Sequence, residues 1–118
     1  MTTSEMATVL AWHDALNAGD LDTLVSLSSD DIEIGDAHGA AQGHAALRSW
    51  AQGLGRTIEP GRIYVHDGVV VVEEKVEGEG PAASAFRVVA DHVTSVFRHD
   101  DLAAALAATE LTEADLTG

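Results

Sequence analysis

The fold is decided by residues 15–36, which read ALNAGDLDTLVSLSSDDIEIGD. Apolar residues recur at helical intervals before this stretch and into it, which predicts a helix from about residue 4 to 17. Gly19 is placed to end that helix, and Asp20 has the residue type of an N-cap for a second, short helix. Two helices are therefore expected before the first strand.

The first strand is predicted over residues 31–36, where apolar and polar residues alternate. Ile32, Ile34 and Asp36 share one face of it, which puts a carboxylate on the apolar side. The glycine-containing segment 37–43 is expected to be a loop, and a third helix should follow it. The apolar residues of that helix recur at helical spacing and are Leu47, Trp50, Ala51 and Leu54.

The second half of the chain predicts two β-hairpins and a last helix. Asp67-Gly68 is a strong hairpin signal, and a second turn is expected around Asp91-His92. The four strands are predicted over residues 62–66, 69–77, 84–90 and 93–98. Asp100 or Asp101 is expected to cap an alanine-rich helix, with a frayed tail from about Thr112.

This order of elements predicts an α+β fold, in a single domain over residues 1–118. Four consecutive antiparallel strands cannot make a doubly wound sheet, because such a sheet alternates strands with crossover helices. The order suits a sheet that carries its helices on one face.

Residues 15–36, with GHAALRSW at 43–50, resemble the nuclear-transport-factor-2-like (NTF2-like) superfamily, which includes ketosteroid isomerases and SnoaL-type polyketide cyclases. More loosely, the resemblance continues through the strands to Arg98. It implies a cone in which a curved antiparallel sheet, with the N-terminal helices over its concave face, encloses an apolar pocket, often in a homodimer. Isomerases, dehydratases, cyclases and pure binding proteins share this fold, so only the site residues can select an activity.

Composition excludes several classes of function. The chain has 6 Lys and Arg against 20 Asp and Glu, and a net charge of -14 repels nucleic acids and anionic membranes. It has no cysteine, and therefore no disulfide or thiolate chemistry. No apolar run is long enough to cross a bilayer, and the first residues lack the pattern of a secretion signal, so a cytoplasmic protein is expected.

Asp36 is the first candidate for a catalytic residue. Its apolar neighbours on the strand face favour a desolvated carboxylate that serves as a general base. By resemblance, Asp36 falls where ketosteroid isomerases keep the aspartate that moves the proton. The alternative is a solvated aspartate that only opens the following loop.

His13 and Glu74 are the other two catalytic candidates. His13 lies in the apolar arc of the first helix, either facing a pocket or as a core histidine bound to a backbone carbonyl. Glu74 shares its strand face with valines, either as part of an acid–base couple or bound to Arg87 or Arg98, for example at a dimer interface.

The rest of the ketosteroid isomerase site is replaced. Trp12 stands where the resemblance places a tyrosine, and Ser84 stands near the position of the acid that binds the oxyanion. Both are candidates for substrate binding. So are Trp50, as a possible wall of the pocket, and Tyr64 and His66, which share one strand face of undecided orientation.

No cofactor or metal is expected. Asp36, His38 and His44 lie on or beside one loop, but loop histidines without regular spacing do not guarantee convergent ligands. The sequence has no serine-hydrolase elbow, phosphate loop or dinucleotide motif. The leading hypothesis is a pocket for a small apolar or polyketide-like molecule, with Asp36 as the base of a cofactor-independent isomerase, cyclase or dehydratase. The alternative is a non-catalytic ligand-binding or dimerisation module.

Overall fold

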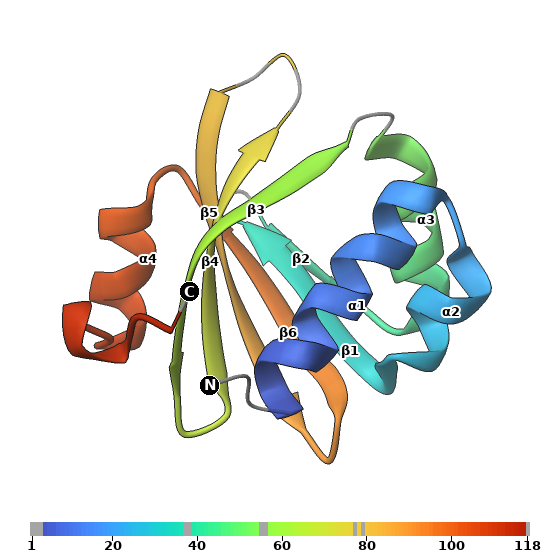
Figure 1. The fold of residues 1–118 in the computed structure, drawn as a ribbon. Helices are drawn as coiled ribbons and strands as arrows, with labels where there is room; N and C mark the ends of the chain where they lie inside the picture. The colour runs from blue at the N-terminus through green and yellow to red at the C-terminus, as the bar shows by residue number, and fades with distance from the viewer. Residues whose placement is uncertain (1–3, 37–38, 55–56, 77, 79, 118) are drawn as a thin grey trace.

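The computed structural model describes residues 4–36, 39–54, 57–76, 78 and 80–117 (Figure 1). Their helices are α1 (Ser4–Ala18), α2 (Leu21–Ser26), α3 (His44–Leu54), α4 (Leu102–Thr109) and the short 3-10 helix η1 (Glu113–Asp115). Their strands are β1 (Ser28–Asp36), β2 (Gly39–Gln42), β3 (Ile58–His66), β4 (Val69–Val76), β5 (Gly80–Val89) and β6 (His92–His99). None of these helices is long and apolar enough to cross a bilayer.

Side-chain caps begin α2 and α4, as the sequence predicts. The Asp20 carboxylate accepts hydrogen bonds from Thr23 N–H at 3.2 Å and from Thr23 Oγ1 at 2.7 Å. At α4, the Asp101 carboxylate accepts one from Ala104 N–H at 2.8 Å. Each cap satisfies a backbone donor that has no partner within its own helix.

The sheet has the strand order β2-β1-β6-β5-β4-β3. Its neighbouring strands are antiparallel except β1 and β6, which are parallel, so the expectation of a fully antiparallel sheet is corrected. The parallel pair arises because β1 lies beside β6, the last strand along the chain. The strands β3 to β6 pair in succession, each antiparallel to the one before it. The sheet is mixed and open.

Both predicted hairpins are confirmed. Asp67 and Gly68 have positive φ angles of 48° and 79°, as a tight two-residue turn between β3 and β4 requires. The turn between β5 and β6 lies one residue earlier than predicted, because the positive φ angles belong to Ala90 and Asp91.

One predicted loop contains a strand. β2 lies within segment 37–43 and pairs with β1, from Glu33 with Gln42 to Asp36 with Gly39. Three of its four residues are Gly or Ala and all four are exposed, so they lack the alternation of apolar and polar side chains that reveals a half-buried strand.

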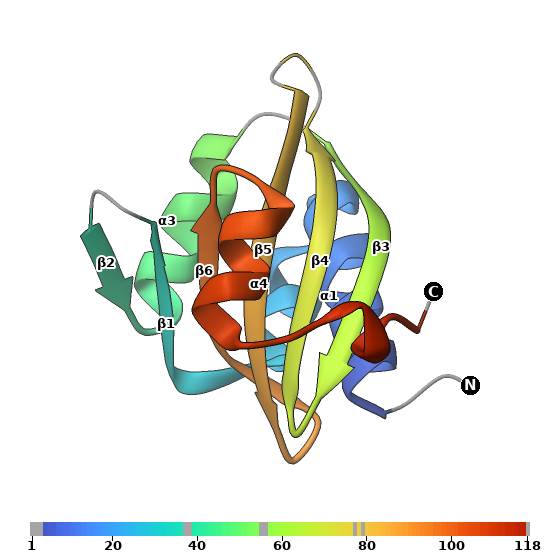
Figure 2. The ribbon, with the colours of Figure 1, turned by 90° about the vertical axis from the view of Figure 1, so that its left-hand side faces the viewer.

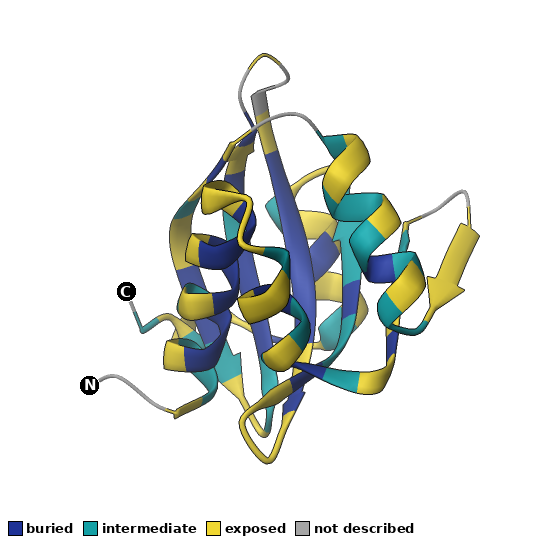
Figure 3. Cartoon of the chain, turned by 90° about the vertical axis from the view of Figure 1, so that its right-hand side faces the viewer, coloured by how far each residue is buried: buried dark blue, intermediate teal, exposed yellow. Residues whose placement is uncertain are grey.

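Helices cover both faces of the sheet, which corrects the expectation of helices on one face only (Figure 2). The helices α1, α2 and α3 cover the face that holds the larger core, and their buried positions alternate with exposed ones (Figure 3). On the other face, α4 packs over a smaller apolar cluster that includes Tyr64, Val71 and Ala105.

The tail beyond α4 is ordered, contrary to the predicted fraying from Thr112. Thr112 and Asp115 form a capping box around η1, in which Thr112 N–H donates to the Asp115 carboxylate at 2.9 Å. Thr117 N–H donates to the Ile63 carbonyl at 2.8 Å, so the tail is bound to β3.

Candidate functional site

A cavity of about 430 Å³ lies between α1, α3, β2 and the sheet face that holds the larger core. Its aromatic lining residues are Trp12, Trp50 and Phe86, and its charged ones are Asp36, Glu74 and Arg98. An apolar cavity with a few polar groups is the usual form of a small-molecule site.

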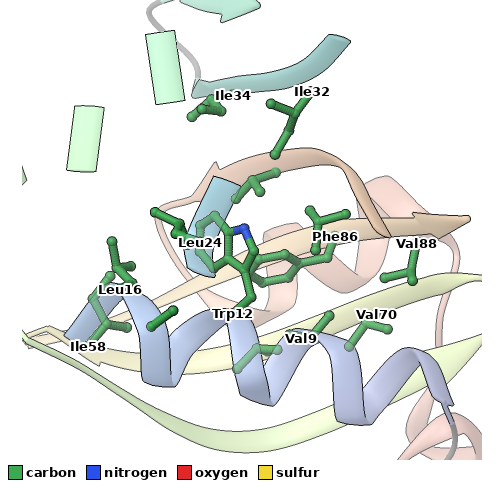
Figure 4. Packing of buried hydrophobic residues seen from close by; sticks show 14 of the residues in the cluster. Val9, Trp12, Leu16, Leu24, Ile32, Ile34, Ile58, Val70, Phe86 and Val88 are labelled. Atoms are coloured by element: carbon green, nitrogen blue, oxygen red, sulfur yellow. The ribbon is translucent and has the colours of Figure 1, made fainter. Parts of the chain in front are cut away.

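The aromatic wall is centred on Trp12, which is 1% exposed and lies against Phe86 (Figure 4). The Trp12 ring is 5.4 Å from Phe86 in an edge-to-face arrangement and 5.9 Å from Trp50. Trp12 Nε1–H donates to Ser28 Oγ at 3.1 Å, so this indole donor is occupied within the core. Trp12 and Trp50, both predicted as substrate-binding residues, therefore lie on the cavity surface.

His13, Glu74 and Ser84 form a buried hydrogen-bonded group. His13 Nε2 lies 2.6 Å from Glu74 Oε2, and Ser84 Oγ–H donates to Glu74 Oε1 at 2.5 Å. Glu74 and Ser84 line the cavity, whereas His13 stands behind Glu74 and packs its ring against Phe86. The structure thus brings together three residues predicted separately for the site.

Hydrogen bonding fixes the number of protons on this group. The Val9 carbonyl can only accept, so His13 Nδ1–H donates to it, at 2.9 Å. The short contact between Nε2 and Oε2 then needs one shared proton. The pair is either imidazolium with carboxylate or imidazole with carboxylic acid, and it is neutral overall in both cases. His13 therefore makes both the bond to a backbone carbonyl and the pairing with Glu74 that the sequence left open.

Strand register aligns the polar residues across the floor of the cavity. Ser84 on β5 pairs with Arg98 on β6, and neighbouring residues directly opposite one another share a face. Gly35 pairs with Phe97, so Asp36 and Arg98 each follow one residue later on adjacent strands. A polar row therefore runs from Asp36 through Arg98 and Ser84 to Glu74.

This polar row has two different ends. Glu74 and Ser84, 3% and 4% exposed, form what we term the deep end of the cavity. Asp36 is exposed and Arg98 is partly exposed, and we term these two residues the outer end. Asp36 thus faces the cavity beside Ile34, although it is more hydrated than the strand pattern suggests.

Tyr64 and His66 lie away from the cavity. Tyr64 is fully buried under α4 on the opposite face of the sheet, and its hydroxyl lies 3.4 Å from Glu113 Oε1. His66 is exposed, and its ring nitrogens lie 3.3 Å from Asp67 and 3.4 Å from Asp115. Alternation along β3 puts both on the face that Ile63 and Val65 do not occupy.

Within the part of the chain that the structure describes, no group of three or more His, Asp and Glu side chains is arranged to hold a metal ion. His44 Nε2–H donates to the Ser28 carbonyl at 3.2 Å, and His38 lies outside the described residues. Phe86 was missed as a lining residue, and Arg98, named from the sequence only as a possible partner of Glu74, lines the cavity with it. Strand parity could have indicated them, because Phe86 shares a face with Ser84, and Arg98 shares one with Val96.

A mixed sheet that curves around a cavity beneath N-terminal helices defines a protein with the NTF2-like fold. The chain belongs to the SnoaL-like domain family, which matches residues 9–105. The sequence matches none of the curated proteins.

Solved structures support the fold. An NTF2-like protein of unknown function from Cytophaga hutchinsonii has a TM-score of 0.73 at 13% identity, covering 86% of this chain and 92% of its own. A Sinorhizobium meliloti protein, provisionally assigned as a polyketide cyclase, has a TM-score of 0.73 at 20% identity, with coverages of 79% and 94%. TerC, co-crystallised with polyporic acid, has a TM-score of 0.73 at 16% identity, with coverages of 86% and 95%.

Proposed function

We propose that the cavity binds a small, largely apolar, polyketide-like molecule and that Asp36 transfers a proton on it without a cofactor. The observation that carries this proposal is that Asp36 and Arg98 line the same aromatic-walled cavity as the buried Glu74. The provisional assignment of the Sinorhizobium meliloti protein as a polyketide cyclase supports the polyketide-like class, and the co-crystallisation of TerC with polyporic acid supports a small organic ligand.

Asp36 is the better candidate for the base. Glu74 is 3% exposed and its oxygens are bonded to the buried His13 and Ser84, whereas Asp36 is exposed at the outer end of the cavity, where a proton can be exchanged with less rearrangement of the core. Asp36 lies at the cavity surface, next to the strand position of Arg98. In this scheme Glu74 assists by holding the ligand, and His13 assists by holding Glu74 in place.

The proposed step conserves atoms and charge. The Arg98 guanidinium donates hydrogen bonds to a carbonyl oxygen of the ligand. Asp36 takes a proton from the adjacent carbon, so the C–H bond breaks, an O–H bond forms on Asp36, and the electron pair moves to the carbonyl oxygen as an enolate. Asp36 then returns the proton to the same carbon or to a conjugated one, which would give an isomerisation.

Deuterium incorporation into 2-tetralone tests the step. The chain has two tryptophans, and both line the cavity, so quenching of their fluorescence reports binding. In D₂O the protein should accelerate exchange of the protons next to the carbonyl, followed by NMR, and Asp36→Asn should lower that rate about 100-fold. Asp31→Asn, an exposed acid on the same strand, is the charge-matched control. Unchanged exchange in Asp36→Asn would exclude Asp36 as the base.

A specific observation favours a second candidate, the non-catalytic binding module. The Trp12 indole N–H is bound to Ser28, and the Ser84 hydroxyl is bound to Glu74. Neither is oriented as the donor that the resemblance would place there. Quenching by 2-tetralone without any accelerated exchange would support this candidate over the enzyme.

We also propose a homodimer, as the resemblance implies. Sedimentation velocity at micromolar to millimolar concentrations tests the oligomeric state, and a single monomeric species over that range would contradict the dimer.

A further inference from the structure

At the deep end of the cavity, Glu74 and Ser84 offer hydrogen-bond acceptors to a ligand but no hydrogen-bond donor. The proton between His13 and Glu74 lies on the line from Nε2 to Oε2, and the Ser84 hydroxyl proton points to Oε1. Glu74 and Ser84 therefore turn only lone pairs toward a ligand. Trp12 adds no donor there, because its N–H is bound to Ser28.

The charge at the deep end also restricts the ligand. Because His13 and Glu74 share one proton, the pair is neutral overall and gives an ammonium group no full opposite charge to replace its lost hydration. A carboxylate would place its own lone pairs against those of Glu74 and Ser84. A hydroxyl group donates one hydrogen bond and carries no charge, so it satisfies both restrictions.

We propose that the deep end binds the hydroxyl group of an uncharged ring compound, with Glu74 and Ser84 as its acceptors. This inference rests on the proposed function, in which a carbonyl of the same ligand lies at the outer end against Asp36 and Arg98. Glu74 lies on β4 and Arg98 on β6, two strands apart, which is about 10 Å at the usual strand spacing. Two fused rings with oxygens at opposite ends match that separation.

A matched ligand pair tests the proposal. The 6-hydroxy and 6-methoxy forms of 2-tetralone have the same rings and the same ketone, but only the first has a hydroxyl proton. Wild-type protein should bind the hydroxy compound about tenfold more tightly, because the methoxy compound leaves buried acceptors without a partner. Tryptophan quenching gives the Kd of each. Equal binding, or tighter binding of the methoxy compound, would overturn the inference.

Variants assign the preference to the deep end. In Glu74→Gln the amide offers an N–H to the cavity, so the ratio of the two Kd values should fall to about one to three. Asp14→Asn removes an exposed acid from α1 and should keep the wild-type ratio, while an equal fall there would contradict a specific role for Glu74. If Glu74→Gln does not fold, as circular dichroism would show, the wild-type ratio alone decides. Binding without a hydroxyl preference defeats only this inference, whereas failure of all three tetralones to bind defeats the proposed function as well.

Discussion

His13 and Glu74 are 61 positions apart in the sequence, yet their Nε2 and Oε2 atoms lie 2.6 Å apart in the core. One residue comes from α1 and the other from β4, so this hydrogen bond ties a helix directly to an inner strand of the sheet. Both side chains are almost completely buried, at 1% and 3% exposure. His13, which does not line the cavity, cannot gain a water partner without local rearrangement.

The single substitutions His13→Leu and Glu74→Leu should each lower the free energy of unfolding by about 3 kcal/mol, because each leaves a buried polar partner without its hydrogen bond. The double substitution should cost clearly less than the sum of the two. Urea unfolding and a double-mutant cycle measure this coupling. Additive losses would mean that the two side chains contribute to stability independently.

Gly35 should not tolerate a side chain, whereas Gly53 should. A Cβ at Gly35 would lie 2.8 Å from the Ala40 Cβ, so Gly35→Ala should displace β2 and destabilise the fold by about 1 to 3 kcal/mol. A Cβ at Gly53, within α3, would meet nothing within 4 Å. Gly53→Ala should therefore stabilise the protein by about 0.5 to 1 kcal/mol. Thermal unfolding measures both, and a neutral Gly35→Ala would contradict the close contact of β2 with β1.

Asp101→Ala should lower the free energy of unfolding by about 1 kcal/mol, because it removes the acceptor for Ala104 N–H at the start of α4. Asp100→Ala is the matched control, since Asp100 is exposed and precedes the cap. That change should stay within about 0.5 kcal/mol of wild type. Equal losses in both variants would point to a general charge effect instead of a cap.

Hydrogen bonds from the Thr23 side chain and backbone lower the pKa of Asp20 from its model-compound value of 3.8. Because the folded-state pKa is the lower one, the cap stabilises the fold above pH 3.8 and loses that contribution as the pH falls through the folded-state pKa. NMR titration should place the pKa of Asp20 below 3.8. Thr23→Val should raise the pKa of Asp20 toward the ordinary value, and an unchanged titration in that variant would contradict the stated cause.

The sequence predicts the helices and strands that are marked by apolar spacing, caps or turn residues within one short segment. Apolar spacing and caps indicated α1 to α4, and Asp67-Gly68 indicated the β3–β4 hairpin. The small, exposed residues of β2 carry no such signal. The pairing of β1 with β6 depends on contacts between distant segments, which alternation within one strand does not encode.

For the site, periodicity showed which side chains point inward but not which ones meet. The parity of Glu74 among valines and the position of His13 on an apolar arc both indicated buried side chains. Their contact depends on where α1 crosses β4, a long-range property. On β3, alternation alone could not decide which face lines the cavity, so Tyr64 and His66 were as plausible as the residues that do line it.

The parallel pairing of β1 with β6 has a consequence for synthesis of the chain. The meander from β3 to β6 contains only pairs of strands that are close in sequence, so it can form early. β1 can pair with β2, which is close to it in sequence, but has to wait until residues 92–99 leave the ribosome before it joins β6 and the rest of the sheet. During translation one wall of the ligand cavity is therefore assembled last, although its residues are made among the first.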